Sequence, residues 1–304
     1  MNDAIAIRAF TSADLEKTAH FLRRVNELDE RVDGPEDDAF NAFVNLPSNR
    51  GGRWFVLAES AKGVAAVLLS GLYEVADRDK PIRAFRIFVA PEHRGQGLGS
   101  RLLSRLEMQN EGQKVIYRTV VSGDWPSGRG LLERRGFNRS QETLLLRRYG
   151  LPPEVPPLPP GFVIRDANIE RDGDVIASLY NLANRRSFGF APISVSELRE
   201  SLGAPGGRLL ALDAPNGQLV GSVQTLPYFG GVGVLHAIQV APAFQRNGLG
   251  RFLLYTAINA LAQQGFRTVE LTVDRENREA IRLYDSSGFV DWRRDLTYER
   301  QAAS

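Results

Sequence analysis

A chain of 304 residues is long enough for two domains of about 150 residues, each able to bury a core of its own. The 38 Lys and Arg against 36 Asp and Glu give a net charge of +2, too balanced to indicate a nucleic-acid-binding surface. The absence of cysteine excludes disulfides, thiolate metal ligands and mechanisms through an acyl-cysteine, so any acyl transfer is expected to be direct.

The first half opens with a short strand near Ile7, followed by an amphipathic helical region over residues 13–25. Two strands are predicted next, over 53–58 and 64–73. The following strand, 83–89, is largely apolar, which is typical of the middle of a sheet covered by helices on both faces. We therefore expect an α/β fold with a mixed sheet, of the α+β kind.

Residues 151–161 read L-P-P-E-V-P-P-L-P-P-G, where the paired prolines prevent helix and remove the donors that a central strand needs. Such a segment favours polyproline II and acts as a semi-rigid spacer. The sequence therefore predicts a Pro-rich linker between an N-terminal domain, 1–150, and a C-terminal domain, 162–304.

The second half repeats the first. Val89-Ala90-Pro91 recurs 151 residues later as Val240-Ala241-Pro242, and each copy is followed at the same spacing by Gly-Leu-Gly and a Leu-Leu pair. The elements predicted for the second half are a helix over 174–184, strands over 208–212, 219–226 and 232–240, a helix ending at Gly265, a strand over 268–273 and a helix over 278–286. The two halves share a common template.

A glycine-rich turn joins the central strand of each half to the next helix. Glycine lets the backbone approach a ligand, and the unpaired first N–H groups of a helix form an anion site that suits a pyrophosphate. The alternative is a glycine-rich turn with a solvated helix start. The predicted binding residues are Arg94, Gly95, Gln96, Gly97, Leu98 and Gly99 in the first half, and Gln245, Arg246, Asn247, Gly248, Leu249, Gly250 and Arg251 in the second.

The turn resembles the [QR]-x-x-G-x-[GA] signature of GNAT acetyltransferases. The second half also carries Asn277, Ala280, Leu283, Tyr284 and Gly288-Phe289, which is similar to the second GNAT motif. The resemblance implies two GNAT acyl-CoA N-acyltransferase domains in tandem, an arrangement similar to that of mycothiol synthases, with acetyl-CoA as cosubstrate and no metal. It further implies that Ile238, Gln239 and Val240 bind the pantetheine arm, and that Asn277 binds that arm or caps its helix.

The resemblance also implies the catalytic groups. Tyr284 occupies the position of the hydroxyl that protonates the departing coenzyme A thiolate, and His236 that of a histidine base on the central strand. The alternatives are a packing aromatic for Tyr284 and a buried core histidine for His236, with Glu270 and Asp274 as reserve bases.

In the first half, the same register places Phe85 where His236 lies and Leu132 where Tyr284 lies, and neither can move a proton. Trp125-Pro126 and Gly128 predict that the helix there begins late and is short. We therefore expect a non-catalytic N-terminal domain that retains the coenzyme loop.

The expected activity is acetyl-CoA-dependent acetylation of a small primary amine through a ternary complex in the C-terminal domain. A non-catalytic CoA-binding regulatory or scaffolding protein, an acetyltransferase of protein N-termini or lysines, and a bulkier acyl donor stay open. Phe188, Phe190 and Tyr228 are candidate acceptor-pocket residues, with core packing as the alternative. The acceptor is expected to be set by residues 184–202 and by the final strands near Trp292 and Tyr298. We expect a cytoplasmic monomer or homodimer that binds neither membrane nor nucleic acid.

Overall fold

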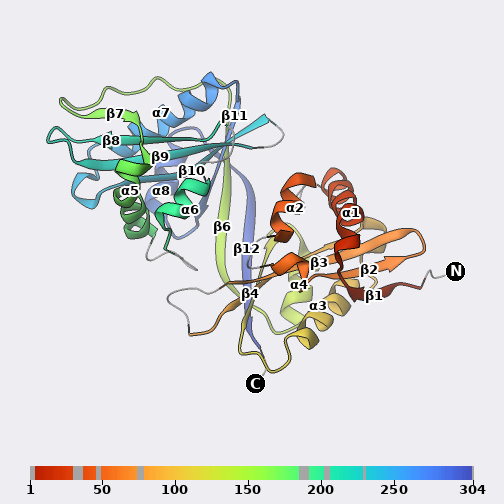
Figure 1. The fold of residues 1–304 in the computed structure, drawn as a ribbon. Coiled ribbons are helices and arrows are strands. Elements are labelled where there is room, and N and C mark those ends of the chain that lie inside the picture. The colour runs from red at the N-terminus through yellow and green to blue at the C-terminus, as the bar shows by residue number, and fades with distance from the viewer. Residues whose placement is uncertain are drawn as a thin grey trace. The chain divides into compact units, whose positions relative to one another are not determined.

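The computed structural model describes residues 4–29, 37–45, 49–73, 79–184, 192–201, 206–228 and 231–302. They form two compact units: unit 1 comprises residues 1–142 and 295–304, and unit 2 comprises 143–294 (Figure 1). The division therefore falls within a strand, not at the proline-rich segment where the sequence places the boundary.

Unit 1 is a mixed sheet with helices on both faces. Strands β1 to β4 pair antiparallel in sequence order, β4 pairs parallel with β5, and β5 pairs antiparallel with the end of β12. Helices α1 and α2 cover one face of the sheet, and α3 covers the other. The elements are β1 (Ala6–Ala9), α1 (Leu15–Leu28), α2 (Asp37–Asn45), β2 (Val56–Ser60), β3 (Gly63–Tyr73), β4 (Ile82–Val89), α3 (Leu98–Gln109), β5 (Ile116–Ser122), α4 (Pro126–Arg134), the start of β6 (Asn138–Tyr149) and the end of β12 (Val290–Gln301).

Unit 2 repeats this plan. Strands β7 to β10 pair antiparallel in sequence order, β10 pairs parallel with β11, and β11 pairs antiparallel with the end of β6. Helix α7 packs on one face of β9 and β10, and α5 packs on the other. The elements are β7 (Val163–Asp166), α5 (Ile169–Asn184), α6 (Val195–Ser201), β8 (Arg208–Asp213), β9 (Leu219–Tyr228), β10 (Val232–Val240), α7 (Leu249–Gln263), β11 (Thr268–Asp274) and α8 (Arg278–Asp285).

Strands β6 and β12 explain why the boundary differs from the predicted one. Residues 143–149 of β6 pair with β11 in unit 2, whereas residues 295–301 of β12 pair with β5 in unit 1. Each half thus contributes the end of its last strand to the other half's sheet. Turn chemistry marks where a strand ends but not which sheet the strand joins, so the prolines gave no sign of this exchange.

The proline-rich segment packs on unit 2. The Asn259 side chain on α7 donates to the carbonyl of Pro153 (2.8 Å), and Val155, Leu158 and Phe162 lie against the α7 core. The Phe162 ring also packs edge-on against that of Phe244, with ring centroids 6.3 Å apart. The segment is therefore a strap held by unit 2 rather than a free spacer.

Helix α4 corrects the prediction of a late start. It begins at Pro126 and runs for nine residues, against eight in its counterpart α8. Proline is well tolerated at the first helical position, because the N–H it lacks would be unpaired there and its fixed φ is already helical. The degraded motif of the first half therefore still forms the helix.

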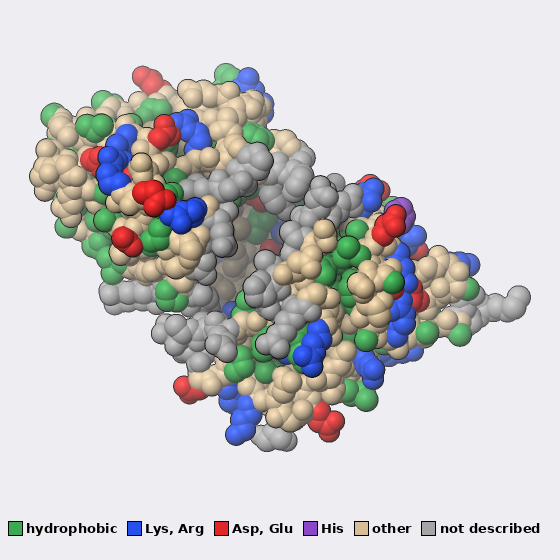
Figure 2. Space-filling view, viewed as in Figure 1, with side chains coloured by type: hydrophobic (Ala, Val, Ile, Leu, Met, Phe, Trp, Pro, Cys, Tyr) green, Lys and Arg blue, Asp and Glu red, His purple; other side chains and the backbone are tan. Residues whose placement is uncertain are grey.

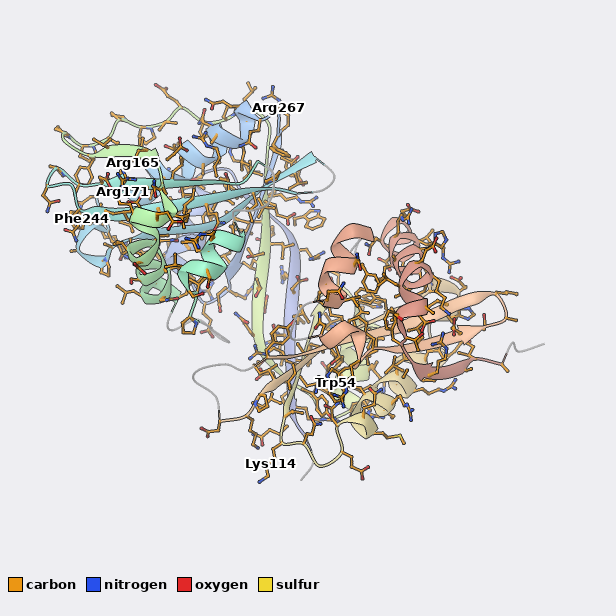
Figure 3. All side chains as sticks on the ribbon, in the orientation of Figure 1. Trp54, Lys114, Arg165, Arg171, Phe244 and Arg267 are labelled. Carbon is orange, nitrogen blue, oxygen red and sulfur yellow. The ribbon has the colours of Figure 1, made fainter. Side chains whose placement is uncertain are left out.

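An arginine anchors the first helix of each unit to the sheet. Arg165 on β7 donates to Asp172 of α5 (2.6 Å) and to Asp213 of β8 (2.6 Å), and Arg171 also binds Asp172 (2.9 Å; Figure 3). In unit 1, Arg8 binds Asp14 and Glu59 in the same way. These hydrogen bonds from Arg165 and Arg171, together with the Asn168 N–H, outweigh burial and hold the pKa of Asp172 well below its usual range.

Replacing Asp172 with Asn is expected to lower the free energy of unfolding by about 2 kcal/mol at pH 7, since it removes the buried charge that Arg165 and Arg171 both bind and leaves Arg165 paired with Asp213 alone. Because the pKa of Asp172 is depressed in the folded state, its contribution is present above about pH 4 and fades as the pH falls further. Urea unfolding at several pH values measures both effects. The control, Asp166→Asn in the exposed pair with Arg208, should cost less than about 1 kcal/mol; equal losses in the two variants would contradict the anchoring role.

Within the described residues, no helix is long and apolar enough to cross a membrane. On the face drawn in Figure 2, Lys and Arg side chains are interspersed with Asp and Glu. This mixture agrees with the small net charge of the sequence.

Candidate active site

A gap opens between the two parallel strands of each unit. β10 pairs with β11 over Val232–Val234 and then diverges from it, just as β4 pairs with β5 over Ile82–Ala84. The later part of β10 still pairs with β9 on its other edge. The main-chain groups of Ile238, Gln239 and Val240 that face β11 are therefore left without a strand partner, as the predicted contacts to an extended ligand arm require.

His236 is the extra residue of a β-bulge. The β9–β10 register shifts between Leu235 and Ala237, whereas the β3–β4 register of unit 1 runs without a shift. By its pairing with the neighbouring strands, Phe85 therefore corresponds to Leu235, and His236 has no counterpart in unit 1. This corrects the sequence alignment of Phe85 with His236, which a constant spacing of 151 residues had suggested.

The bulge sets the direction of His236. Leu235 and Ile238 both pack into the core beneath α7, so His236 and Ala237 are placed together on the opposite, α5-facing side. Glu270 of β11 lies on that same side, because its neighbours Val269 and Leu271 enter the α7 core. A bulge in one half thus brings an imidazole to the mouth of the gap.

The His236 ring is exposed, so it is not the buried core histidine that was the alternative. Protein atoms around it still displace part of its hydration, and this desolvation lowers the pKa of His236 below its ordinary value of 6.5. A lowered pKa keeps the imidazole neutral near pH 7. In that form its free ring nitrogen can accept a proton.

Tyr284 lies on the other face of the sheet, the side that α7 covers. It lies on α8, half-buried against the α7 core, with its ring 5.8 Å from that of Phe289. Burial raises the pKa of Tyr284 to about 12. The phenol therefore keeps its proton throughout the physiological range and can donate it.

Tyr284 and Leu132 are true counterparts. The Phe289 N–H donates to the Tyr284 carbonyl (3.1 Å), and the Phe137 N–H donates to the Leu132 carbonyl (3.0 Å). Unit 1 therefore places a buried aliphatic side chain where unit 2 places a phenol. This part of the sequence alignment is confirmed.

The loop before α7 has the geometry of an anion cradle. Gly248 is left-handed (φ 78°), and Arg246 is also left-handed (φ 67°), the sole such non-glycine residue among those described. The first intrahelical bond runs from the Phe252 N–H to the Gly248 carbonyl (3.0 Å). The N–H groups of Leu249 and Gly250 therefore precede the helical ladder and point outward, at the positive end of the helix dipole.

Several side chains of the loop shape it rather than face a ligand. Gln245 donates to the Val240 carbonyl (2.9 Å), and Arg94 donates to the matching Val89 carbonyl (3.1 Å), so each closes the turn after its strand. Arg94 also pairs with Asp29 (2.6 Å). Two further side chains bind the backbone just before the loop: Gln96 donates to the Glu92 carbonyl, and Asn247 donates to the Phe244 carbonyl. Two arginines bind side chains at α8 or just after it: Arg246 pairs with Glu279, and Arg251 donates to Ser286.

Three other candidates have structural partners. Asn277 caps α8 by accepting from the Ala280 N–H (3.1 Å), which is one of its two predicted roles. Glu270 is held by Arg147 (2.8 Å), and Asp274 accepts from the Glu276 N–H (2.8 Å) in the turn after β11. Both residues that were reserve candidates for the base therefore already accept hydrogen bonds within the protein.

Unit 1 contains a pocket of about 360 Å³ at its own strand gap. Its walls include the loop residues Arg94, Gly97 and Gly99, and also Phe85 and Leu132. The Trp125 ring closes one side, 4.7 Å from the Arg94 guanidinium. The pocket combines the glycine-rich loop with two apolar side chains, Phe85 and Leu132, which correspond to Leu235 and Tyr284 of unit 2.

The aromatic residues considered for acceptor binding lie in different parts of the molecule. Tyr298 lies in the core of unit 1, where its hydroxyl donates to Glu133 (2.9 Å), so it does not contribute to the unit 2 site. Trp292 lies in unit 2 under the Arg147 guanidinium, 3.3 Å from its ring centroid. Phe188, Phe190 and the Tyr228 side chain lie outside the described residues.

Two family models match the chain: one described as Acetyltransferase (GNAT) family over residues 176–289, and one described as Acetyltransferase (GNAT) domain over 50–139. The mycothiol acetyltransferase of Actinosynnema mirum is 31% identical, over 94% of this chain and 96% of its own. Two solved structures share the fold: a GCN5-related N-acetyltransferase from Sphaerobacter thermophilus (TM-score 0.75, 21% identity, 99% and 96% coverage) and a tandem GNAT protein from the clavulanic acid biosynthesis pathway (TM-score 0.74, 16%, 99% of each chain).

These matches confirm the predicted family and the tandem arrangement, and the family implies acetyl-CoA as cosubstrate. The distant mycothiol acetyltransferases point to N-acetylation of a small molecule. The chain belongs to the GNAT N-acetyltransferases, as a member with two GNAT domains in tandem.

Proposed function

We propose that unit 2 transfers the acetyl group of acetyl-CoA directly to the primary amine of a small molecule within a ternary complex. The observation that carries this proposal is the arrangement around the β10–β11 gap. A neutral imidazole lies at one face, a protonated phenol approaches from the other, and the free helix N–H groups lie at the end of β10.

The reaction needs three proton movements: two protons leave the nitrogen and one reaches the sulfur. A primary ammonium with a pKa near 10 must lose a proton before its nitrogen attacks the thioester carbon. His236 takes that proton, directly or through water. As the tetrahedral intermediate collapses, the C–S bond breaks and Tyr284 donates its proton to the departing sulfur, while the nitrogen passes its surplus proton through water to the Tyr284 phenolate. This yields the amide and free coenzyme A and restores Tyr284. The β10 main chain past the bulge supplies an N–H to the oxyanion.

Unit 1 has a different part in this proposal. Its pocket keeps the coenzyme loop but carries Phe85 and Leu132, which transfer no proton. We infer that unit 1 binds coenzyme A without turning it over, so the full chain has two coenzyme sites and one reaction centre.

A matched pair of glycines tests this division. Gly97 and Gly248 have nearly the same φ (76° and 78°), and in both places a Cβ would meet open space, so valine acts through backbone strain alone. Strain of about 1–2 kcal/mol corresponds to a loss of about 5- to 30-fold in affinity. Gly248→Val should raise the KM for acetyl-CoA by that factor, whereas Gly97→Val should change it less than about twofold.

Calorimetry on the full chain measures how many coenzyme A molecules bind and how tightly. We expect two sites per wild-type chain, and in Gly97→Val a lower affinity at the unit 1 site alone. Equal kinetic losses from the two variants would contradict the assignment of the chemistry to unit 2. Coenzyme binding with no amine-dependent thiol release from any amine would instead favour a non-catalytic coenzyme-binding protein.

A further inference from the structure

Three polar side chains are buried on the α5-facing side of unit 2. Ser222, Gln224 and Gln239 are 0%, 3% and 5% exposed. Gly221 and Val223 adjoin the α7 core, so the alternating residues of β9 face α5, and Ser222 lies directly opposite Gln239 across the strand pair.

Unit 1 builds the same face from apolar residues. By register, Val67 and Phe88 pair as Ser222 and Gln239 do, and Leu69 takes the place of Gln224. All three unit 1 side chains are buried in the core beneath α1. The fold therefore does not need polar groups at these positions, and their presence in unit 2 calls for another cause.

Two of these polar groups lack partners. The Ser222 hydroxyl and the Gln239 side-chain oxygen are buried and form no hydrogen bond with any residue that the structure describes. A buried polar group left without a partner destabilises the fold, so native proteins seldom keep one without a use for it. Both lie on the side where the bulge places His236, and Gln239 is two residues past Ala237, about 7 Å along the strand.

We propose that Ser222 and Gln239 recognise the acceptor by hydrogen-bonding a neutral polar group close to its amine. This inference rests on the proposed function, since it adds a substrate class to the same site. An amide and a hydroxyl match hydroxyl or carboxamide groups and offer no charge, and Glu270, on the same side of the sheet, is paired with Arg147. The acceptor class is therefore small amines bearing hydroxyl or carboxamide groups, rather than alkyl or arylalkyl amines.

Paired acceptors of similar shape test the class: D-glucosamine against cyclohexylamine, and glycinamide against propylamine. Initial rates of thiol release from acetyl-CoA should give the polar member of each pair a kcat/KM higher by on the order of tenfold or more. An equal or reversed preference in both pairs would overturn the inference.

The variants Ser222→Val and Gln239→Leu give unit 2 the apolar character of unit 1. Each should raise the KM for the polar acceptor by on the order of tenfold, while the Tm stays constant or rises. Ser222→Val should in addition change kcat less than about twofold. The acetyl-CoA affinity of Ser222→Val should match that of wild type. An unchanged acceptor KM in both variants would show that these groups have a structural role and would overturn the inference.

Val67→Ser is the matched control in unit 1. It buries an unpaired hydroxyl away from the reaction centre, so the Tm should fall while the acceptor KM stays the same. Failure of the proposed function looks different. In that case wild type releases no thiol with any acceptor, or the Tyr284→Phe variant is as active as wild type on every acceptor.

Discussion

Replacing Tyr284 with phenylalanine is expected to lower kcat by about 10²- to 10⁴-fold, the range that a positioned proton donor contributes. The substitution removes one oxygen and keeps the ring that packs against Phe289. Because the coenzyme loop is untouched, the affinity for acetyl-CoA should stay within about twofold of wild type. Stopped-assay kinetics and calorimetry on the same preparation separate the two quantities.

Tyr298→Phe is the control for this prediction. It removes a phenol that is also buried and also has a raised pKa, but one that donates to Glu133 within unit 1. Its effect should fall on stability, with kcat nearly unchanged. Similar losses of kcat in the two variants would show that the catalytic phenol has been assigned to the wrong residue.

The pKa of Tyr284, the proposed proton donor, also determines how kcat depends on pH on the alkaline side. Because burial raises the pKa of Tyr284 to about 12, loss of its proton should not reduce turnover at any pH up to about 10.

Replacing His236 with glutamine is expected to lower kcat/KM by about 10²-fold near pH 7 and to remove a pH dependence. In wild type, kcat/KM should rise with pH as His236 loses its proton, with a midpoint below 6.5 because desolvation lowers its pKa. The acceptor amine titrates near pH 10, well away from this limb. Glutamine preserves size and polarity but does not titrate, so the acidic limb should disappear.

A pH–rate profile from pH 5 to 9 in both proteins measures this effect. Retention of the same acidic limb in His236→Gln would assign the base to another group. Glu270→Gln would then be the next variant to measure, since Glu270 faces the same side of the sheet with Arg147 as its partner.

The local chemistry of the sequence predicted much of the fold. The glycine-rich segments predicted the turns before α3 and α7, and apolar runs predicted the central strands. Asn277 was predicted to cap α8 or to bind the pantetheine, and the cap is present. These features depend on residues close together in the chain, and for that reason periodicity and motif spacing find them.

The features that sequence reasoning missed depend on pairing between distant segments. The exchange of β6 and β12 is set by which sheet edge each strand meets, and nothing within 138–149 or 290–301 encodes that choice locally. The bulge at His236 was hidden because the motifs on either side of the gap keep nearly constant spacing. Its one signal was the number of residues that separates matching positions of β4 and β10. This is 150 at the start of the strands and 151 at their ends, so β10 holds one extra residue.

Arg246 shows how a local rule can be broken near a site. Unit 1 has Gly95 at the matching left-handed position, where arginine costs about 1–2 kcal/mol. Its side chain is exposed and pairs with Glu279, so this ion pair ties the loop to α8. The signature [QR]-x-x-G-x-[GA] accepts any residue at this position, so it could not reveal the strained backbone of Arg246.

A crystal structure of the full chain with coenzyme A tests the central claim most directly. We predict that the pyrophosphate lies on the N–H groups of Leu249 and Gly250, the pantetheine runs along β10 past the bulge, and the sulfur lies within hydrogen-bonding distance of the Tyr284 hydroxyl. A coenzyme bound in unit 2 with its sulfur directed away from Tyr284, or one bound solely in unit 1, would contradict it.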